Sequence, residues 1–363
     1  MVKKLCLTGG PCGGKTTALA RLSQSLSSRG FYPLIVPEAA TLLIGGGISP
    51  STWKSQDFQT RVIQTVLALE SSFARAADSR IDLNPVLLCD RGLADSLAYV
   101  PDDIYLQALR VNGIPSHVAA RDEHYDAVFH LVTAAKGAET FYTLANNAAR
   151  SETAEEACAL DARTLAAWMG APHLRAIDNS TDFEGKLAKL DREVCAALGI
   201  PVPLEIERKF MCEPVMLGAL PRGAQHIEIE QMYLMSNEPG TELRIRKRGQ
   251  NGNFTYYRTE KKYCAPGVRS ETERLITAAE YALSAQFRKS STDILRKTRI
   301  CFMFEHQYFE LDIIPRRDGS DLCLLEIELT DLAQHVSIPP FIRVMRDVTD
   351  DITYSNAHLA KAV

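Results

Sequence analysis

Residues 5–16 read Leu5-Cys6-Leu7-Thr8-Gly9-Gly10-Pro11-Cys12-Gly13-Gly14-Lys15-Thr16. From Gly9 onward they fit the pattern G-x-x-x-x-G-K-[ST], between an apolar strand-like run and a helical pattern over residues 16–27. Glycines at these positions let backbone N–H groups surround phosphate oxygens, and the helix N-terminus adds a positive partial charge. The motif predicts a nucleotide-binding loop in which Lys15 contacts the β- and γ-phosphates and Thr16 binds Mg²⁺. The predicted nucleotide-binding residues of this stretch are Gly9, Gly10, Gly13, Gly14, Lys15, Thr16 and Thr17.

Strand-like and helical segments alternate through the first 200 residues. Strands are predicted at residues 4–8, 33–36, 85–89, 127–131 and 174–178, and helical patterns fill the gaps, as at 57–72 and 183–198. Such alternation is typical of an α/β fold, in which helices cover both faces of a parallel sheet.

Two acids end predicted strands next to the loop. Asp90 ends the third strand, where a carboxylate suits a water-mediated Mg²⁺ contact or a catalytic base. A helix cap or a structural pair with Arg91 is the alternative. Glu38 ends the second strand and suits either an acceptor site or a structural role.

These acids belong to a larger pattern, which comprises Glu38, Asp90-Arg91-Gly92, Asp95, Tyr99 and Ile177-Asp178-Asn179. The pattern resembles the NadR-type AAA family, which is related to nucleoside and nucleotide kinases, over most of residues 1–198. The resemblance implies a lid over residues 137–150. It also implies that Arg150 stabilises transferred phosphate charge, unless it is a solvated helix residue, and that Asn179 contacts the base. Since the acceptor pocket carries no recognisable signature, kinase activity does not follow from the loop alone.

The sequence pattern changes at Gly199-Ile200-Pro201-Val202-Pro203, where two prolines in three residues favour an extended connector. Short segments with period-2 alternation follow, and one helix is predicted near residues 278–288. Eight such strands predict an antiparallel sheet closed into a barrel. The predicted domains are therefore residues 1–198 and 204–363, joined by 199–203. The eight segments are residues 204–210, 227–233, 242–248, 254–261, 268–276, 294–302, 308–315 and 322–329.

Charged residues in the second domain recur two positions apart, so that each pair lies on one face of its strand. A solvated outer face is the ordinary explanation, but apolar residues intervene on several strands and both signs of charge are abundant. Buried charges that face one interior need partners, because an unpaired one costs several kcal/mol. A divalent cation satisfies clustered carboxylates, and a polyphosphate satisfies clustered lysines and arginines.

Six of these motifs occur in the same order as in the CYTH family, the triphosphate tunnel metalloenzymes, which residues 204–360 resemble. They are Glu205-x-Glu207-x-Lys209, Leu243-Arg244-Ile245-Arg246, Thr259-x-Lys261, Lys297-x-Arg299, Glu310-Leu311-Asp312 and Glu326-Ile327-Glu328. The resemblance implies a tunnel that binds a triphosphate.

The same resemblance implies roles for individual residues. Glu205, Glu207 and Lys209 are the candidate catalytic residues of this domain, as Asp90 is of the first, for attack of water on a metal-polarised phosphate. The implied ligands of Mg²⁺ or Mn²⁺ are Glu205, Glu207, Asp312, Glu326 and Glu328. The implied triphosphate-binding residues are Lys209, Arg244, Arg246, Lys261, Lys297 and Arg299, with Arg258 a weaker candidate because it is out of phase with Lys261.

Two functions fit these patterns. The first is a metal-dependent triphosphatase joined to an ATP- or GTP-binding kinase or NTPase domain. The second follows from the domain order, which resembles the family of the TRPL translocation defect protein and implies a non-catalytic regulator that binds GTP and phosphoinositide at a membrane surface. The basic runs Arg246-Lys247-Arg248 and Arg316-Arg317 are candidates for its membrane-facing element. The acids favour the first function, because a head-group binder needs lysine and arginine but no metal-ligating glutamates.

Composition narrows the class of protein further. A net charge of -4 gives no whole-molecule field that argues for nucleic acid as a partner. No run of about 20 apolar residues and no secretory signal is recognisable, so no transmembrane span is expected. Nine cysteines without a C-x-x-C pair indicate reduced thiols in a cytoplasmic protein, with peripheral membrane contact left open.

Overall fold

The computed structural model describes residues 2–138, 153–200, 206–236, 238, 241–265, 268–329 and 334–362. The chain divides into two compact units, Met1–Ile200 and Pro201–Val363. Two predicted site residues, Arg150 and Glu205, lie outside the described residues, as does most of the predicted lid. Over the part of the chain that is described, no helix is both long enough and apolar enough to cross a membrane.

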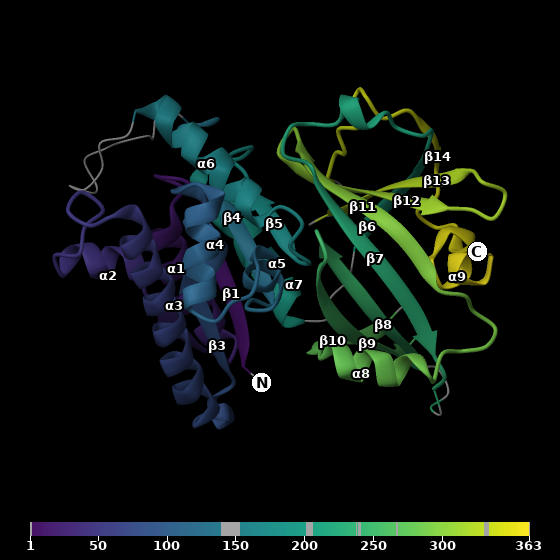
Figure 1. The fold of residues 1–363 in the computed structure, drawn as a ribbon, viewed down its shortest axis with the longest axis horizontal. Helices are drawn as coiled ribbons and strands as arrows, with labels where there is room; N and C mark the ends of the chain where they lie inside the picture. Colours follow the sequence, from purple (N-terminus) through teal and green to yellow (C-terminus); the bar gives the residue numbers. More distant parts are fainter. Residues whose placement is uncertain are drawn as a thin grey trace. The chain divides into compact units, whose positions relative to one another are not determined.

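The first unit is an α/β fold with a parallel sheet in the order β2-β3-β1-β4-β5, as the sequence predicted (Figure 1). Its strands are β1 (Lys3–Thr8), β2 (Tyr32–Val36), β3 (Pro85–Asp90), β4 (Ala127–Leu131) and β5 (Leu174–Ile177). Its helices are α1 (Lys15–Ser28), α2 (Ala39–Gly45), α3 (Ser55–Asp78), α4 (Asp102–Val111), α5 (His117–Asp122), α6 (Ala154–Trp168) and α7 (Phe183–Leu198), with 3-10 turns η1 (Ile81–Leu83) and η2 (Leu93–Ala98).

Burial of apolar side chains positions the nucleotide-binding loop. The central strands β1 and β4 are buried along most of their length, and α1 packs the apolar stripe Ala18, Leu22 and Leu26 against them. Because the strands are parallel, the carboxyl ends of β1, β3 and β4 meet at one edge of the sheet. The loop that follows β1 lies at this edge, where ligands of open α/β sheets bind.

The second unit is an antiparallel sheet in the order β10-β9-β8-β7-β11-β12-β13-β6-β14 (Figure 1). Its strands are β6 (Ile206–Cys212), β7 (Gln225–Leu234), β8 (Thr241–Gln250), β9 (Asn253–Ala265), β10 (Val268–Ile276), β11 (Leu295–Phe304), β12 (Gln307–Pro315), β13 (Asp321–Leu329) and β14 (Val344–Asp347). Its helices are α8 (Ala278–Ala285) and α9 (Asn356–Ala362), with 3-10 turns η4 (Leu217–Ala219) and η5 (Ile352–Tyr354).

This sheet differs from the eight-stranded closed barrel predicted from the sequence. It has a ninth strand, β14, whose four residues Val344–Asp347 are too few to show an alternating pattern. Within the described residues, no backbone pairing joins the two outermost strands, β10 and β14. The antiparallel architecture and the eight predicted strands are therefore confirmed, and the described pairings add β14 and leave β10 and β14 as the outermost strands.

The two faces of the sheet have different chemistry. One face packs apolar residues against α8 and against chain near residues 215–224 and 334–344. The other face, called here the charged face, carries charged or polar side chains from strands β6 and β8–β13, which the cross-strand registers bring together. It comprises Glu207, Lys209, Arg244, Arg246, Arg248, Thr259, Lys261, Glu273, Lys297, Arg299, Glu310, Asp312, Glu326 and Glu328.

Candidate functional site

The nucleotide-binding loop has a backbone that only glycine allows at two positions. Gly14 caps α1 with a φ of 87°, in the left-handed region. A Cβ on Gly9 would lie 2.1 Å from the carbonyl oxygen of Leu131, so β4 leaves no space for a side chain there. The loop thus lies directly against the neighbouring strand, with its open side available for a ligand.

Lys15 lies at the first turn of α1 with its ammonium folded over the loop. Its Nζ is 3.4 Å from the carbonyl oxygen of Gly9. Burial, and next the nearby charge of Arg91, lower the pKa of Lys15 to about 8, against the opposing effect of Asp90. A cation held in this environment gains from an anionic partner, which is what the phosphates of a nucleotide would supply.

The acids near the loop differ in whether they pair with Arg91. Arg91 donates from Nε to Glu38 Oε1 at 2.7 Å and from Nη1 to Asp95 Oδ1 at 3.2 Å. Burial opposes ionisation of Glu38, but the charges of Arg91 and Lys15 lower its pKa below the ordinary value. Glu38 is therefore placed as a partner of Arg91.

Asp90, in contrast, has a buried Oδ1 without a hydrogen-bond partner in the described structure. Burial raises the pKa of this carboxyl, with Lys15 as the main opposing charge. Of the two predicted acids, Asp90 is the one whose oxygen is available to a ligand.

Sequence reasoning missed Asp161, which holds the loop from its other side. Asp161, on α6, accepts hydrogen bonds from the backbone N–H groups of Gly10 (2.8 Å) and Thr133 (3.1 Å). Asn179, which was predicted to contact the base, donates its amide hydrogens to the carbonyl oxygens of Thr133 (2.8 Å) and Lys136 (2.7 Å). No motif marks Asp161, because its role arises from a contact with residues far away in the sequence.

In the second unit, Arg299 is the centre of a buried ionic network. Its Nε and Nη2 each lie 2.7 Å from an oxygen of Asp312, and its Nη2 lies 2.6 Å from Glu326 Oε2. Its Nη1 donates to Glu310. Lys297 Nζ is 2.5 Å from Asp312 Oδ2. Asp312, which the sequence analysis predicted to bind metal, is thus paired with two cations in this network.

The remaining carboxylates of this network repel one another. Burial, and next the charge of Glu326, raise the pKa of Glu207 to about 7. Lys209 Nζ lies 2.9 Å from Glu326 Oε1 and 3.2 Å from Glu207 Oε1, and the latter oxygen is buried without a bond of hydrogen-bond geometry. Glu328 lies directly across from Glu207 in the register and is exposed to solvent.

Glu207, Glu326 and Glu328 are the described candidates for ligands of the divalent cation that the family resemblance implies. Among the described residues, which exclude Glu205, no three His, Cys, Asp or Glu side chains converge tightly enough to form a metal site. The donor chemistry nevertheless fits: Glu207 has a raised pKa, an oxygen without a hydrogen bond, and Glu326 and Glu328 as neighbours. Hard oxygen donors of this kind suit Mg²⁺.

Arginines dominate the other end of the charged face. Arg246 Nη2 donates to Glu273 Oε1 at 2.9 Å, and Arg244 Nη2 lies 3.9 Å from Glu273 Oε2. Arg248 follows on the same face and is 2 % exposed. Three arginines thus share this end with the acid Glu273 and with Lys261, an arrangement that favours an anionic ligand.

The register corrects two predictions made from the sequence. Arg258 pairs with Ile245, which packs against the α8 side of the sheet, so Arg258 faces away from the predicted triphosphate-binding residues. The run Arg246-Lys247-Arg248 does not form one exposed basic surface, because Arg246 and Arg248 lie on the charged face and Lys247 on the opposite one.

The charged face is bounded by an apolar cluster at the end where α9 packs. Leu359 and Ala360 of α9 contact Leu295, Ile314 and Leu324 of the sheet. Asn356, the first residue of α9, accepts a hydrogen bond from Lys297 at 3.2 Å. A ligand on the charged face therefore meets an apolar wall at this end.

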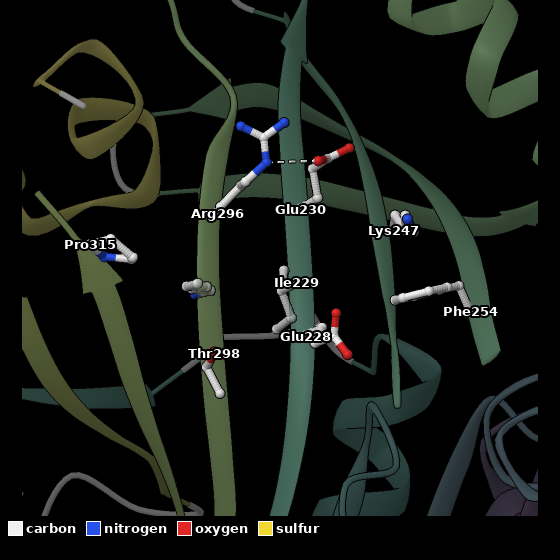
Figure 2. A pocket seen from close by; sticks show the side chains of 9 residues that line it. Glu228, Ile229, Glu230, Lys247, Phe254, Arg296, Thr298 and Pro315 are labelled. Atoms are coloured by element: carbon white, nitrogen blue, oxygen red, sulfur yellow. Dashed lines mark hydrogen bonds and ion pairs between the residues drawn. The ribbon is translucent and has the colours of Figure 1, made fainter. Parts of the chain in front are cut away.

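A hollow of about 260 Å³ lies on the opposite face of β7 and β11 (Figure 2). It is formed mainly by the alternate positions Glu228 and Glu230 on β7 and Arg296 and Thr298 on β11. Arg296 Nε is 3.0 Å from Glu230 Oε2, and Lys247 lies over the ring of Phe254. Except for Lys297, the residues that line it are not among those predicted to bind phosphate.

Comparison with known proteins gives one family and several similar structures. The family model described as an AAA domain matches residues 4–186, which agrees with the predicted first domain type. No curated protein matches the chain.

Three solved structures are similar to parts of this chain. A crystal structure of the inorganic triphosphatase NE1496 is 27% identical, with 44% of this chain and 96% of that chain covered and a TM-score of 0.33. A structure of NadR protein in complex with NAD and AMP-PNP is 16% identical, with 55% of this chain and 51% of that chain covered and a TM-score of 0.39. The PH1012 protein from Pyrococcus horikoshii OT3 is 23% identical, with 35% of this chain and 80% of that chain covered and a TM-score of 0.25.

Proposed function

The chain belongs to the AAA domain family, and from that premise we propose that its first unit binds ATP or GTP while its second unit binds and hydrolyses a triphosphate with a divalent cation. The observation that carries the second part is the buried ionic network on the charged face. On this face Arg299 forms ion pairs with Glu310, Asp312 and Glu326, and Lys297 forms one with Asp312. Buried ion pairs contribute little net stability, because burying their charges costs free energy. So many of them at one place are typical of a site that binds a charged ligand.

For the first unit, the residues around the loop support nucleotide binding. The loop supplies backbone N–H groups, Lys15 supplies a cation for the β- and γ-phosphates, and Thr16 supplies a hydroxyl for Mg²⁺. Asp90 supplies an unpaired carboxylate oxygen for a metal-bound water or for an acceptor hydroxyl. These groups fit either phosphoryl transfer to an acceptor or hydrolysis of the nucleotide.

For the second unit, the cations would bind the substrate. The charged face carries Arg244, Arg246 and Lys261 at one end and Lys209 and Arg299 at the other. A linear polyphosphate would therefore find hydrogen-bond donors along its length. Glu207, Glu326 and Glu328, with Glu205, would hold the cation. When bound, this ion would polarise a phosphate group for attack by water. The protein's own residues orient the chain of phosphates and exclude bulk water from it.

The apolar wall at α9 supports a preference for inorganic tripolyphosphate over a nucleoside triphosphate. Leu295, Ile314 and Leu324 end the charged face where α9 packs, so this end offers no polar space for a sugar and base. A nucleoside would have to project from the charged face at a point away from α9, into solvent. A bare tripolyphosphate meets no such restriction.

Phosphate release from tripolyphosphate, ATP and GTP, with Mg²⁺ or Mn²⁺, tests this proposal on the full chain. We expect tripolyphosphate hydrolysis to fall at least roughly 100-fold in the double variant Glu207→Gln/Glu328→Gln, because removing the acids removes the metal ligands. Lys15→Ala should leave this activity unchanged. The matched control is Glu228→Gln, which changes an exposed glutamate on the opposite face of β7.

Absence of hydrolysis by the wild type in every condition would overturn the triphosphatase. If vesicles containing phosphoinositide then bound the chain, and GTP bound to the wild type but not to Lys15→Ala, the regulator would replace it.

The pH dependence of stability provides a separate test of the carboxylate cluster in the absence of metal. The pKa of Glu207 is raised to about 7 in the folded protein, so between about pH 4.5 and 7 the folded state binds more protons than the unfolded one. Stability should therefore fall as pH rises through this window. Glu207→Gln should be stabilised relative to wild type as pH rises, by on the order of 1 kcal/mol, since this side chain is 38% exposed and solvent screens it. Denaturant melts with EDTA at pH 4.5 and 7 measure this, and parallel curves for the two proteins would contradict it.

A further inference from the structure

The most unusual group next to the nucleotide-binding loop is the carboxylate of Asp161. A single oxygen, Oδ1, accepts from Gly10 N at 2.8 Å and from Thr133 N at 3.1 Å, and it lies 3.1 Å from His130 Nε2. Asp161 is 4 % exposed, and Gly10 lies 151 residues earlier in the sequence. Through Asp161, helix α6 contacts the nucleotide-binding loop at Gly10.

This placement has an electrostatic cost that calls for a compensating role. Although burial opposes it, hydrogen bonds from His130, Gly10 and Thr133 lower the pKa of Asp161, so the carboxylate is ionised at neutral pH. An anion beside a phosphate-binding loop repels the ligand the loop is meant to attract. The bond also uses the N–H of Gly10, which then is not directed to a phosphate. Asp161 consequently acts on the loop's conformation and not on the ligand.

Gly10 itself is shaped for this contact. A Cβ on Gly10 would lie 2.6 Å from the Cβ and 2.7 Å from the Oδ1 of Asp161. The close approach of the two backbones therefore requires a residue without a side chain at position 10.

A second layer of contacts fixes the segment on the other side of Asp161. The Thr133 hydroxyl donates to the carbonyl oxygen of Pro11, and Ala134 N donates to Cys12 O at 3.3 Å. The buried ammonium of Lys186 donates to Val132 O at 2.6 Å. The tip of the loop is thus tied to a segment that is itself tied to α7.

We propose that Asp161 is a positioning residue, which holds the nucleotide-binding loop in its phosphate-binding conformation before a nucleotide arrives by tying Gly10 to α6 and to the segment at Thr133. This inference rests on the proposed nucleotide binding by the first unit. Preorganisation of this kind lowers the ordering cost that binding would otherwise carry.

The test compares Asp161→Ala with Asp161→Asn in the full chain. Since one oxygen accepts both backbone hydrogen bonds, the asparagine amide oxygen can replace it, and the alanine cannot. Hydrogen–deuterium exchange of a peptide covering residues 9–17, without nucleotide, should be roughly tenfold faster in Asp161→Ala and near wild type in Asp161→Asn. The dissociation constant for a non-hydrolysable ATP or GTP analogue should rise about tenfold in the alanine variant only.

The matched control is Asp191→Asn, a part-buried aspartate on α7 that bonds Ser25 and Arg29 away from the loop. It should change neither readout. The inference is overturned if Asp161→Ala leaves the exchange rate and the nucleotide affinity unchanged. It is also overturned if the asparagine and alanine variants both fold and lose nucleotide affinity equally.

If Asp161→Ala does not fold, Gly10→Ala provides a second test, because its side chain displaces the same carboxylate. Exchange at the wild-type rate in that variant would overturn the inference. If the wild type binds no nucleotide, the proposed function fails, and the exchange measurement still decides whether Asp161 holds the loop.

Discussion

Replacement of Arg299 by methionine should destabilise the second unit by about 3–5 kcal/mol. Arg299 contacts Glu310, Asp312 and Glu326, and the ion pairs of the described residues link Asp312 also to Lys297 and Glu326 also to Lys209. Its removal leaves carboxylates buried with insufficient positive charge, and repulsion among them adds to the loss of hydrogen bonds. Denaturant unfolding of the full chain, followed by a probe in the second unit, measures the change.

The neighbouring Arg296→Met is the matched control for this prediction. Arg296 is three positions away on the same strand, faces the opposite side, is 64% exposed and pairs with Glu230. An exposed pair contributes at most about 1 kcal/mol, so the control should unfold close to wild type. Equal stability of the two variants would show that the charged face is more open to solvent than the structure has it. Because the Arg299 variant also loses a phosphate ligand, added tripolyphosphate should stabilise it less than it stabilises wild type.

Lys15→Met should weaken binding of ATP or GTP at least roughly 100-fold, because charge-assisted hydrogen bonds to the phosphates are lost inside a buried loop. The variant should not lose stability, since burial lowers the pKa of Lys15 and an apolar side chain removes that desolvation penalty. Isothermal titration with a non-hydrolysable analogue, together with thermal melts, measures both effects.

Lys3→Met serves as the control, since Lys3 is 49% exposed and pairs with Asp126 at the amino end of β1. Nucleotide affinity within threefold of wild type in Lys15→Met would refute the assignment of the loop as the nucleotide site.

Local sequence was sufficient for much of the fold and for the class of each site. The strand, the glycine-rich loop and the helix of the first unit are contiguous in sequence, so their order alone predicted where the loop would lie. In the second unit, side chains two positions apart share a face whatever the fold, so the pairs Lys297 with Arg299 and Glu326 with Glu328 could be placed on one side of a strand. The same rule flagged Arg258 as out of phase, and the register places it on the other face.

Only the tertiary structure decided which of these groups are buried, paired or free. Periodicity gives the side of a strand but not what lies beyond it, so it could not tell that Glu326 is buried while Glu328, on the same face, is exposed. Periodicity also could not show that Asp312 forms ion pairs with Arg299 and Lys297. The four residues of β14 carried too little pattern to be recognised. Asp161 was missed for the same reason: its bond to Gly10 spans 151 residues, and no local preference encodes a contact made only when β4 and α6 pack beside the loop.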